Sequence, residues 1–198
     1  MDDIKTIAET IKNGGVGVFP TDTVYAIGCS ALDTGALKRL YEIRRRPENK
    51  PLLVHIADID QLPGLVLDIP QIAKQLINKY WPGPLTLIFN RNPDTLSDLV
   101  TAQLGTVAVR WPDCPPEIEL IKQAGVPLVA PSANPSGKPP ALNITEARQY
   151  FGEQCDFYLD NGTCNSDQAS TILDISKDKP SLLRPGRIAL SAEDYMVK

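Results

Sequence analysis

Apolar residues recur at helical spacing in several segments of the chain and form short continuous runs between those segments. Residues 3–13 carry apolar side chains spaced as on one face of a helix, and Asn13-Gly14-Gly15 then supplies a stop. The same spacing predicts further helices around 37–41, 72–80, 118–124 and 143–151. Short apolar runs predict strands, or the entry into one, at 16–19, 24–29, 52–54, 85–89, 106–109, 126–130, 157–159, 171–175 and 181–183.

Residues that begin or end helices lie at the edges of these segments. Asp33 or Thr34 is placed to cap the helix around 37–41, and Gly125 is placed to end the helix 118–124. Asn143 and Glu146 have the spacing of a capping box at the start of the helix 143–151. The order of elements predicts one α/β domain over residues 1–198, with polar loops at strand ends, where open sheets usually place their sites.

A cationic loop over residues 44–50 stands out against an acidic chain. The net charge is −4 and the pI is near 5.0, yet four cations fall within these seven residues. Pro47 and Pro51 disfavour a helix there, because each fixes φ and removes a backbone donor. The loop is interpreted either as a site for a polyanion such as a nucleoside triphosphate or as a solvated basic turn.

Several classes of protein and of site are excluded or disfavoured by the sequence. No basic segment followed by an apolar one begins the chain, and no apolar run approaches the ~18 residues of a membrane span, so we expect a cytoplasmic protein without membrane contact. Cys29, Cys114, Cys155 and Cys164 have no metal-ligand spacing, and His55 is the sole histidine, so no protein metal site is predicted. P-loop and Rossmann glycine motifs are absent.

Polar and cationic motifs recur at the ends of the predicted strands, and together they resemble the YrdC-like family. In chain order the motifs are Pro20-Thr21-Asp22-Thr23-Val24-Tyr25-Ala26-Ile27-Gly28, Arg44-Arg45-Arg46-Pro47, Trp81-Pro82-Gly83-Pro84-Leu85-Thr86, Val109-Arg110-Trp111-Pro112, Pro131-Ser132-Ala133-Asn134, Ser170-Thr171 with Asp174, and Leu183-Arg184-Pro185-Gly186. They occur in the family's order from about residue 5 to residue 190, and their combination is highly specific.

The resemblance implies a fold, an activity and a set of partners. The family fold is a twisted, open, mostly parallel or mixed α/β sheet flanked by helices, with a large concave face lined by positive charge. The implied activity is synthesis of threonylcarbamoyl-AMP and pyrophosphate from L-threonine, bicarbonate and ATP, with Mg2+ held mainly by the ATP. The product feeds the t6A modification of tRNA position 37, which implies a downstream, TsaD-like threonylcarbamoyl transferase as a partner.

Site residues are carried over by position from the same resemblance. Threonine contacts fall on Thr23, His55, Arg110 and Ser170, with Arg110 pairing the carboxylate. ATP contacts fall on Arg46, Lys50, Thr106, Ala130, Ser132, Asn134, Pro140 and Arg184. The family signature K-x-R…S-x-N falls on Arg44, Arg46, Ser132 and Asn134, so that the signature lysine is replaced by Arg44. The guanidinium of arginine presents several N–H donors in one plane, whereas lysine presents a single compact ammonium group. This replacement is therefore not neutral at a phosphate site.

Structural interpretations and other functions stay open at this point. Ser132 and Asn134 are also typical turn formers, Arg110 can be a structural ion-pair partner, and His55 can be a core histidine at a strand end. Asp22 and Asp174 are interpreted as acceptors that orient loops. Two further functions compete with the synthase: a module that binds double-stranded RNA or tRNA, and a family paralogue that only hydrolyses ATP. The acidic net charge disfavours strong RNA binding, which rests on many phosphate contacts.

Overall fold

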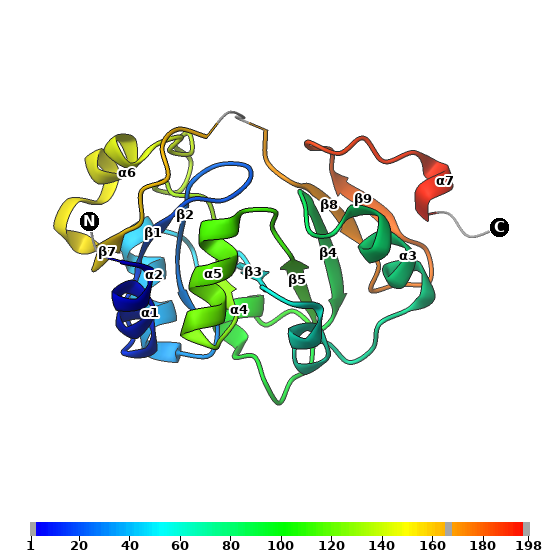
Figure 1. Ribbon diagram of the computed structural model, residues 1–198. Coiled ribbons are helices and arrows are strands. Elements are labelled where there is room, and N and C mark those ends of the chain that lie inside the picture. The colour runs from blue at the N-terminus through cyan, green and yellow to red at the C-terminus, as the bar shows by residue number, and fades with distance from the viewer. Residues whose placement is uncertain (1–2, 165–167, 196–198) are drawn as a thin grey trace.

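Nine strands in the described part of the chain, residues 3–164 and 168–195 of a computed structural model, form one sheet. Their order across the sheet is β7-β1-β2-β6-β3-β5-β4-β8-β9 (Figure 1). The strands are β1 (Gly17–Phe19), β2 (Ala26–Ser30), β3 (Leu53–His55), β4 (Leu85–Asn90), β5 (Thr106–Arg110), β6 (Leu128–Val129), β7 (Phe157–Tyr158), β8 (Thr171–Asp174) and β9 (Ser181–Arg184).

Helices separate consecutive strands from β2 to β7, whereas β1 is followed directly by β2 and β7 by β8 and β9. The α-helices are α1 (Ile4–Lys12), α2 (Thr34–Arg44), α3 (Gln71–Tyr80), α4 (Asp98–Thr101), α5 (Pro115–Ala124), α6 (Ile144–Phe151) and α7 (Ala192–Tyr195), and the 3-10 helices are η1 (Ile59–Gly64) and η2 (Gly152–Gln154). The short elements α4, α7, η1 and η2 were not predicted. They hold too few turns to show a helical period in the sequence.

The predicted helix caps are formed by the expected residues. Asp33 caps α2, because its Oδ1 accepts a hydrogen bond from the backbone N–H of Ala36 at 2.9 Å. At the start of α6, Asn143 Oδ1 accepts from the N–H of Glu146, and Glu146 Oε2 accepts from the N–H of Leu142, both at 2.9 Å. The pair forms the predicted capping-box-like start, in which Glu146 accepts from the residue before the N-cap rather than from the N-cap Asn143 itself. Gly125 ends α5 with φ +72°, a conformation that glycine adopts without strain.

The sheet is mixed, as the expectation of a mostly parallel or mixed sheet allows. Only the pairs β1–β7, β3–β5 and β4–β8 are parallel among the eight pairs of described strands. β2 and β3 run in the same direction on either side of α2, as a βαβ unit would. However, β6 lies between them and pairs with each in the antiparallel sense. An apolar run predicts a strand but does not say which neighbour it pairs with.

Helices cover one face of the sheet and only part of the other. Buried side chains of α2, α3, α4 and α6 belong to the larger core, together with Val54, Leu87 and Val109 from the strands. α1 and α5 pack against each other and against β1, β2 and β6 in a smaller core on the opposite face. Figure 1 shows α1 near β1 and α5 between β2 and β3, both away from β8 and β9. In the described chain, the opposite face of β5, β4 and β8 therefore has no helix packed on it, and α5 reaches only the end of β3 at His55.

No helix in residues 3–164 or 168–195 is long and apolar enough to cross a membrane.

Candidate functional site

A cavity of about 370 Å³ lies on the uncovered part of the sheet. This volume falls in the usual range for small-molecule sites. Strand alternation explains which side chains reach it: on β3 and β5, Leu53, His55, Ala108 and Arg110 point toward the cavity, whereas Val54 and Val109 point into the larger core. The cavity wall contains nine of the residues that the sequence assigns to a site, namely Thr23, Arg44, Arg46, His55, Arg110, Ala130, Ser132, Ser170 and Arg184.

Four predicted site residues lie outside this wall. Lys50 has an exposed side chain, and its hydrogen bonds are made by its backbone: the carbonyl accepts from the hydroxyl of Tyr41 at 2.9 Å and from Nε of Arg46 at 3.3 Å. Thr106 begins β5 and shares the face of Arg110, but it lies at the opposite end of the strand. Pro140 is half-buried in the 131–140 loop. Asn134 is buried and shapes that loop, because its amide donates to the carbonyls of residues 135 and 138 at 2.9 Å.

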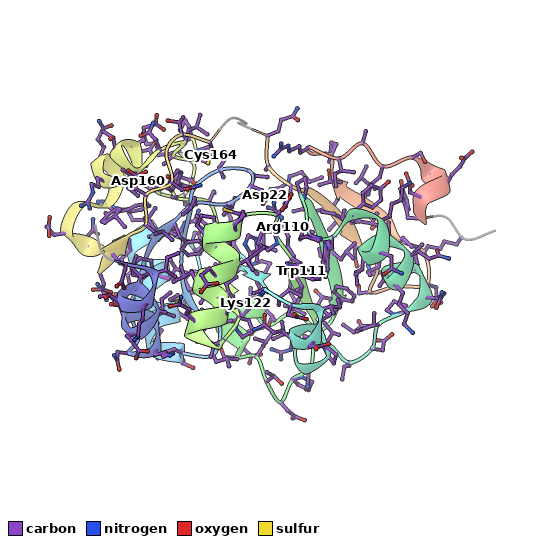
Figure 2. All side chains as sticks on the ribbon, in the orientation of Figure 1. Asp22, Arg110, Trp111, Lys122, Asp160 and Cys164 are labelled. Atoms are coloured by element: carbon purple, nitrogen blue, oxygen red, sulfur yellow. The ribbon has the colours of Figure 1, made fainter. Side chains whose placement is uncertain are left out.

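Arg110 is the best-anchored side chain of the cavity. It is only 2% exposed, and its guanidinium donates to three groups: Nε to the carbonyl of Gly83 at 3.0 Å, Nη1 to Thr23 Oγ1 at 3.3 Å and Nη2 to Asp22 Oδ1. Figure 2 shows Asp22 and Arg110 next to each other near the centre of the molecule. Arg110 is thus a structural ion-pair partner, and its role at a threonine carboxylate stays a prediction.

Hydroxyl groups on either side of Arg110 are held by local hydrogen bonds. Thr21 Oγ1 lies 2.9 Å from Thr23 Oγ1 and donates to the carbonyl of Val24 at 2.7 Å, which fixes the turn after β1. Ser170 Oγ lies 2.8 Å from Thr86 Oγ1. Arg184 reaches back from β9 and donates to the Ser170 carbonyl from Nε at 3.1 Å and from Nη2 at 2.8 Å. Burial lowers the pKa of Arg184.

Two arginines from the cationic loop line the other side of the cavity. Arg44 ends α2, is 2% exposed and donates from Nε to the Asn134 carbonyl at 3.1 Å, while its Nη1 has no partner among the described residues. Burial, with the nearby charge of Arg46, lowers the pKa of Arg44 to about 10, so it stays charged at neutral pH. Arg46 donates to the carbonyl of Pro51 at 2.8 Å. Within residues 3–164 and 168–195 neither arginine is ion-paired to a carboxylate, which leaves both charges for a bound anion.

The interpretation of residues 44–50 as a solvated turn holds for part of the loop only. Arg45 is exposed and adopts φ +49° at the end of α2, where it contributes nothing to the cavity wall. This left-handed residue reverses the chain, so that the N–H of Arg46 bonds to the carbonyl of Tyr41 at 2.9 Å. Arg44 and Arg46 consequently enter the cavity on either side of an arginine that faces solvent.

Glu117 is a site residue that the sequence reasoning missed. It lies in the first turn of α5, and its Oε1 lies 2.5 Å from His55 Nδ1. Both side chains are at most 1% exposed, so His55 is a satisfied core histidine on one side of its ring and part of the cavity wall on the other. The signal was present in the sequence: Glu117 precedes Leu120, Ile121 and Ala124 by three, four and seven residues, which places it on the apolar face of the helix.

Gly83 is a second missed contributor. The segment Trp81-Pro82-Gly83-Pro84 was assigned a packing role, and Trp81 does end α3 and pack its ring in the core. However, the Gly83 carbonyl also accepts the Nε–H of Arg110, and the Gly83 N–H donates to the carbonyl of Trp111 at 2.8 Å. The segment therefore orients Arg110 as well as ending a helix. Asp174, by contrast, is a loop-orienting acceptor as expected, and it accepts from Ser176 N at 2.9 Å.

Residues 3–164 and 168–195 contain no cluster of three or more His, Cys, Asp or Glu side chains that could hold a metal ion. Asp22 is already engaged by Arg110, and Glu117 by His55. The four cysteines are free thiols.

Comparisons with known proteins find similarity over most of the chain. The family model for Sua5, YciO and YrdC proteins, described as telomere recombination, matches residues 9–186. The chain is 44% identical over 185 residues to a threonylcarbamoyl-AMP synthase of Bacillus subtilis, covering 93% of this chain and 54% of that protein. It is 38% identical over 194 residues to a threonylcarbamoyl-AMP synthase of Pyrococcus abyssi, covering 98% and 57%. The chain thus spans little more than half the length of these two relatives.

A solved structure gives the same result for the fold. The chain superimposes on P. abyssi Sua5 complexed with L-threonine with a TM-score of 0.90 and 39% identity, covering 92% of this chain and 54% of that one. The match extends over nearly all of the present chain, so the similarity lies in the fold as a whole and not in one motif.

Proposed function

Because the chain belongs to the Sua5/YciO/YrdC family, we propose that it is a threonylcarbamoyl-AMP synthase, which makes threonylcarbamoyl-AMP and pyrophosphate from L-threonine, bicarbonate and ATP. The observation that carries the proposal is the composition of the cavity wall. Arg44 and Arg46 bring two charges without a carboxylate partner to one side, and Arg110, His55 and Ser170 bring polar groups to the other. The relatives' names and the threonine complex of P. abyssi Sua5 support the same assignment.

The two sides of the cavity suit the two parts of the reaction. Arg44 and Arg46 are suited to phosphate oxygens, because charge-assisted hydrogen bonds to anions are the strong ones. Ser132, on the strand-to-loop turn beside Arg44, adds a hydroxyl on the same side. Arg110, Thr23 and Ser170 are suited to the carboxylate and hydroxyl of threonine. The proposed division leaves the floor of the cavity, Ala108 and Ala130, for apolar contact.

The proposed reaction needs positioning more than a protein nucleophile. Threonine and bicarbonate condense to a carbamate with loss of water, a carbamate oxygen attacks the α-phosphorus of ATP, and pyrophosphate leaves. A carbamate is short-lived in water, so the site must hold it next to ATP and exclude solvent. The two arginines would stabilise charge that develops on the phosphate oxygens. Mg2+ would be held mainly by the ATP, because the described cavity wall offers no free carboxylate.

The product's chemistry suggests where the reaction leads. A mixed carbamic–phosphoric anhydride is reactive, so we infer a downstream threonylcarbamoyl transferase that moves the group to tRNA, with the cytoplasm as the compartment. An RNA-binding module without this chemistry gains no support from the relatives' names, and the acidic net charge disfavours it. A paralogue that only hydrolyses ATP is distinguished from the synthase by whether turnover of ATP requires threonine and bicarbonate.

We expect pyrophosphate release from ATP to require threonine and bicarbonate together. The physical reason is that the attacking oxygen belongs to the carbamate, which forms only when both are present. Pyrophosphate is measured by a coupled assay with each substrate left out in turn, in buffer stripped of CO2. Alanine in place of threonine is the matched control, since it lacks the hydroxyl and methyl groups. Release at an unchanged rate without threonine would identify an ATP-hydrolysing paralogue instead.

A further inference from the structure

The proposed division of the cavity uses His55 but gives no role to Glu117, the buried carboxylate that contacts it. Glu117 lies in the first turn of α5, and its Oε1 lies 2.5 Å from Nδ1 of His55, the last residue of β3. The other two polar atoms of the pair, Nε2 of His55 and Oε2 of Glu117, are buried without a hydrogen-bond partner in the described chain. A buried polar atom without a partner is costly, so such an atom in a cavity wall points to a ligand.

The charges around the pair favour a net-neutral state. Burial raises the pKa of Glu117, and burial together with the charge of Arg110 lowers the pKa of His55. Arg110 is itself compensated by Asp22, and the remaining titratable neighbour, the thiol of Cys114, has its pKa raised to about 12 by burial, so it is neutral. One proton therefore lies in the contact between Oε1 and Nδ1.

This proton count fixes the state of the other ring nitrogen. If the shared proton sits on Oε1, the imidazole is neutral and its own proton must be on Nε2. If the shared proton sits on Nδ1, the ring is an imidazolium and Nε2 again carries a proton. A proton on Oε2 instead would leave a buried hydroxyl without an acceptor in the described residues. The pair thus presents Nε2–H as a donor in both states that satisfy its hydrogen bonds.

The donor lies beside the anchored arginine. His55 and Arg110 are register partners on the parallel strands β3 and β5, and both line the cavity. Two donors side by side, an imidazole N–H and a guanidinium, are suited to an anionic oxygen and are unsuited to an ammonium group. A base that takes a proton from the substrate amine would need a bare Nε2, which the neutral pair does not supply.

We propose that Glu117 is a positioning residue that holds His55 in the form with Nε2–H directed at the cavity, so that His55 donates a hydrogen bond to an anionic oxygen of the bound amino acid. The inference rests on the proposed function for the identity of that amino acid. It assigns Glu117 a role through His55 rather than a contact with substrate. Its consequence is that the proton lost by the threonine amine leaves by a route other than His55.

The test uses the fact that His55 is the sole histidine of the chain. A tag-free chain labelled with 15N-histidine gives two ring-nitrogen signals, and the 15N shift and N–H coupling of each show whether it carries a proton. In the natural chain we expect a protonated Nε2. Glu117→Leu should convert the ring to a mixture of tautomers. Glu117→Gln should keep Nε2–H, because its amide can donate to Nδ1. Glu119→Leu, at an exposed position of the same helix, is the matched control.

Threonine titrations followed by the Nε2 signal connect the tautomer to the ligand. The apparent threonine Kd should rise about tenfold in Glu117→Leu, the range for losing one hydrogen bond to a charged group, and should change little in Glu117→Gln and Glu119→Leu. A bare Nε2 in the natural chain would overturn the proposal even if no variant folds. An Nε2 signal or threonine Kd that Glu117→Leu leaves unchanged would overturn it too. These readouts need no turnover, so absence of synthase activity would count against the proposed function alone.

Discussion

Arg46→Ala is expected to weaken ATP binding by about ten- to a hundred-fold, while Arg45→Ala leaves it nearly unchanged. Each variant removes one positive charge from the same loop, so a diffuse electrostatic effect would be equal in both. Only Arg46 lines the cavity, and losing a hydrogen bond to a charged group costs ~1.5–3 kcal/mol. Arg45 is exposed and already adopts its left-handed conformation with a side chain, so alanine adds little strain.

The measurement is a titration of ATP with Mg2+ against each variant, with threonine absent. Arg46 also holds the carbonyls of Lys50 and Pro51, so its loss could loosen the loop as well as remove a phosphate contact. Arg46→Lys separates the two effects, because a lysine keeps the charge but cannot donate to both carbonyls. Equal weakening by Arg45→Ala and Arg46→Ala would mean that the 44–50 loop acts only as a basic patch.

Arg110→Lys is expected to raise the KM for threonine by about ten- to a hundred-fold with little change in ATP affinity. The guanidinium of Arg110 satisfies Gly83, Thr23 and Asp22 at once, and a lysine ammonium cannot reproduce this planar fork. A lysine would stay with Asp22 and lose the orientation that two parallel hydrogen bonds to a carboxylate require. The phosphate side of the cavity, around Arg44 and Arg46, does not contact Arg110 in this arrangement.

Two titrations on the same variant check this expectation, threonine at saturating ATP and ATP at saturating threonine. Thermal unfolding of the variant is followed in parallel, because a weakened buried ion pair with Asp22 also lowers the free energy of unfolding. A shift of the ATP curve as large as that of the threonine curve would identify Arg110 as a nucleotide or purely structural residue, and the assigned threonine side would then be wrong.

Local features of the fold were predictable because they depend on neighbouring residues. The helix 3–13 corresponds to α1, and the capping residues Asp33, Asn143 and Gly125 act where the sequence places them. Pairing between strands depends on residues far apart in the chain, so the insertion of β6 between β2 and β3 was not predictable from apolar runs. For this reason the sequence left open whether the sheet is mostly parallel or mixed, and the structure shows a mixed one.

Site residues could be predicted where they belong to recognisable sequence motifs. Nine of the assigned residues meet in one cavity because the motifs lie at strand ends on the face that α1 and α5 leave uncovered. Lys50, Thr106, Asn134 and Pro140 lie outside its wall, and a role for them at ATP stays a prediction. Glu117 was missed because no motif includes it. A carboxylate on the apolar face of a helix is the signal that would have identified it, since such a group must find a buried partner.

The identity of the product most directly tests the proposal that the chain is a threonylcarbamoyl-AMP synthase. The chain is incubated with ATP, Mg2+, 13C-bicarbonate and 15N-threonine. The nucleotides are then separated, and their masses are measured by mass spectrometry. We expect threonylcarbamoyl-AMP that carries both labels, formed in equal amount with pyrophosphate. Consumption of ATP to ADP or AMP without any doubly labelled adduct, or no consumption of ATP at all, would contradict the assignment of a threonylcarbamoyl-AMP synthase.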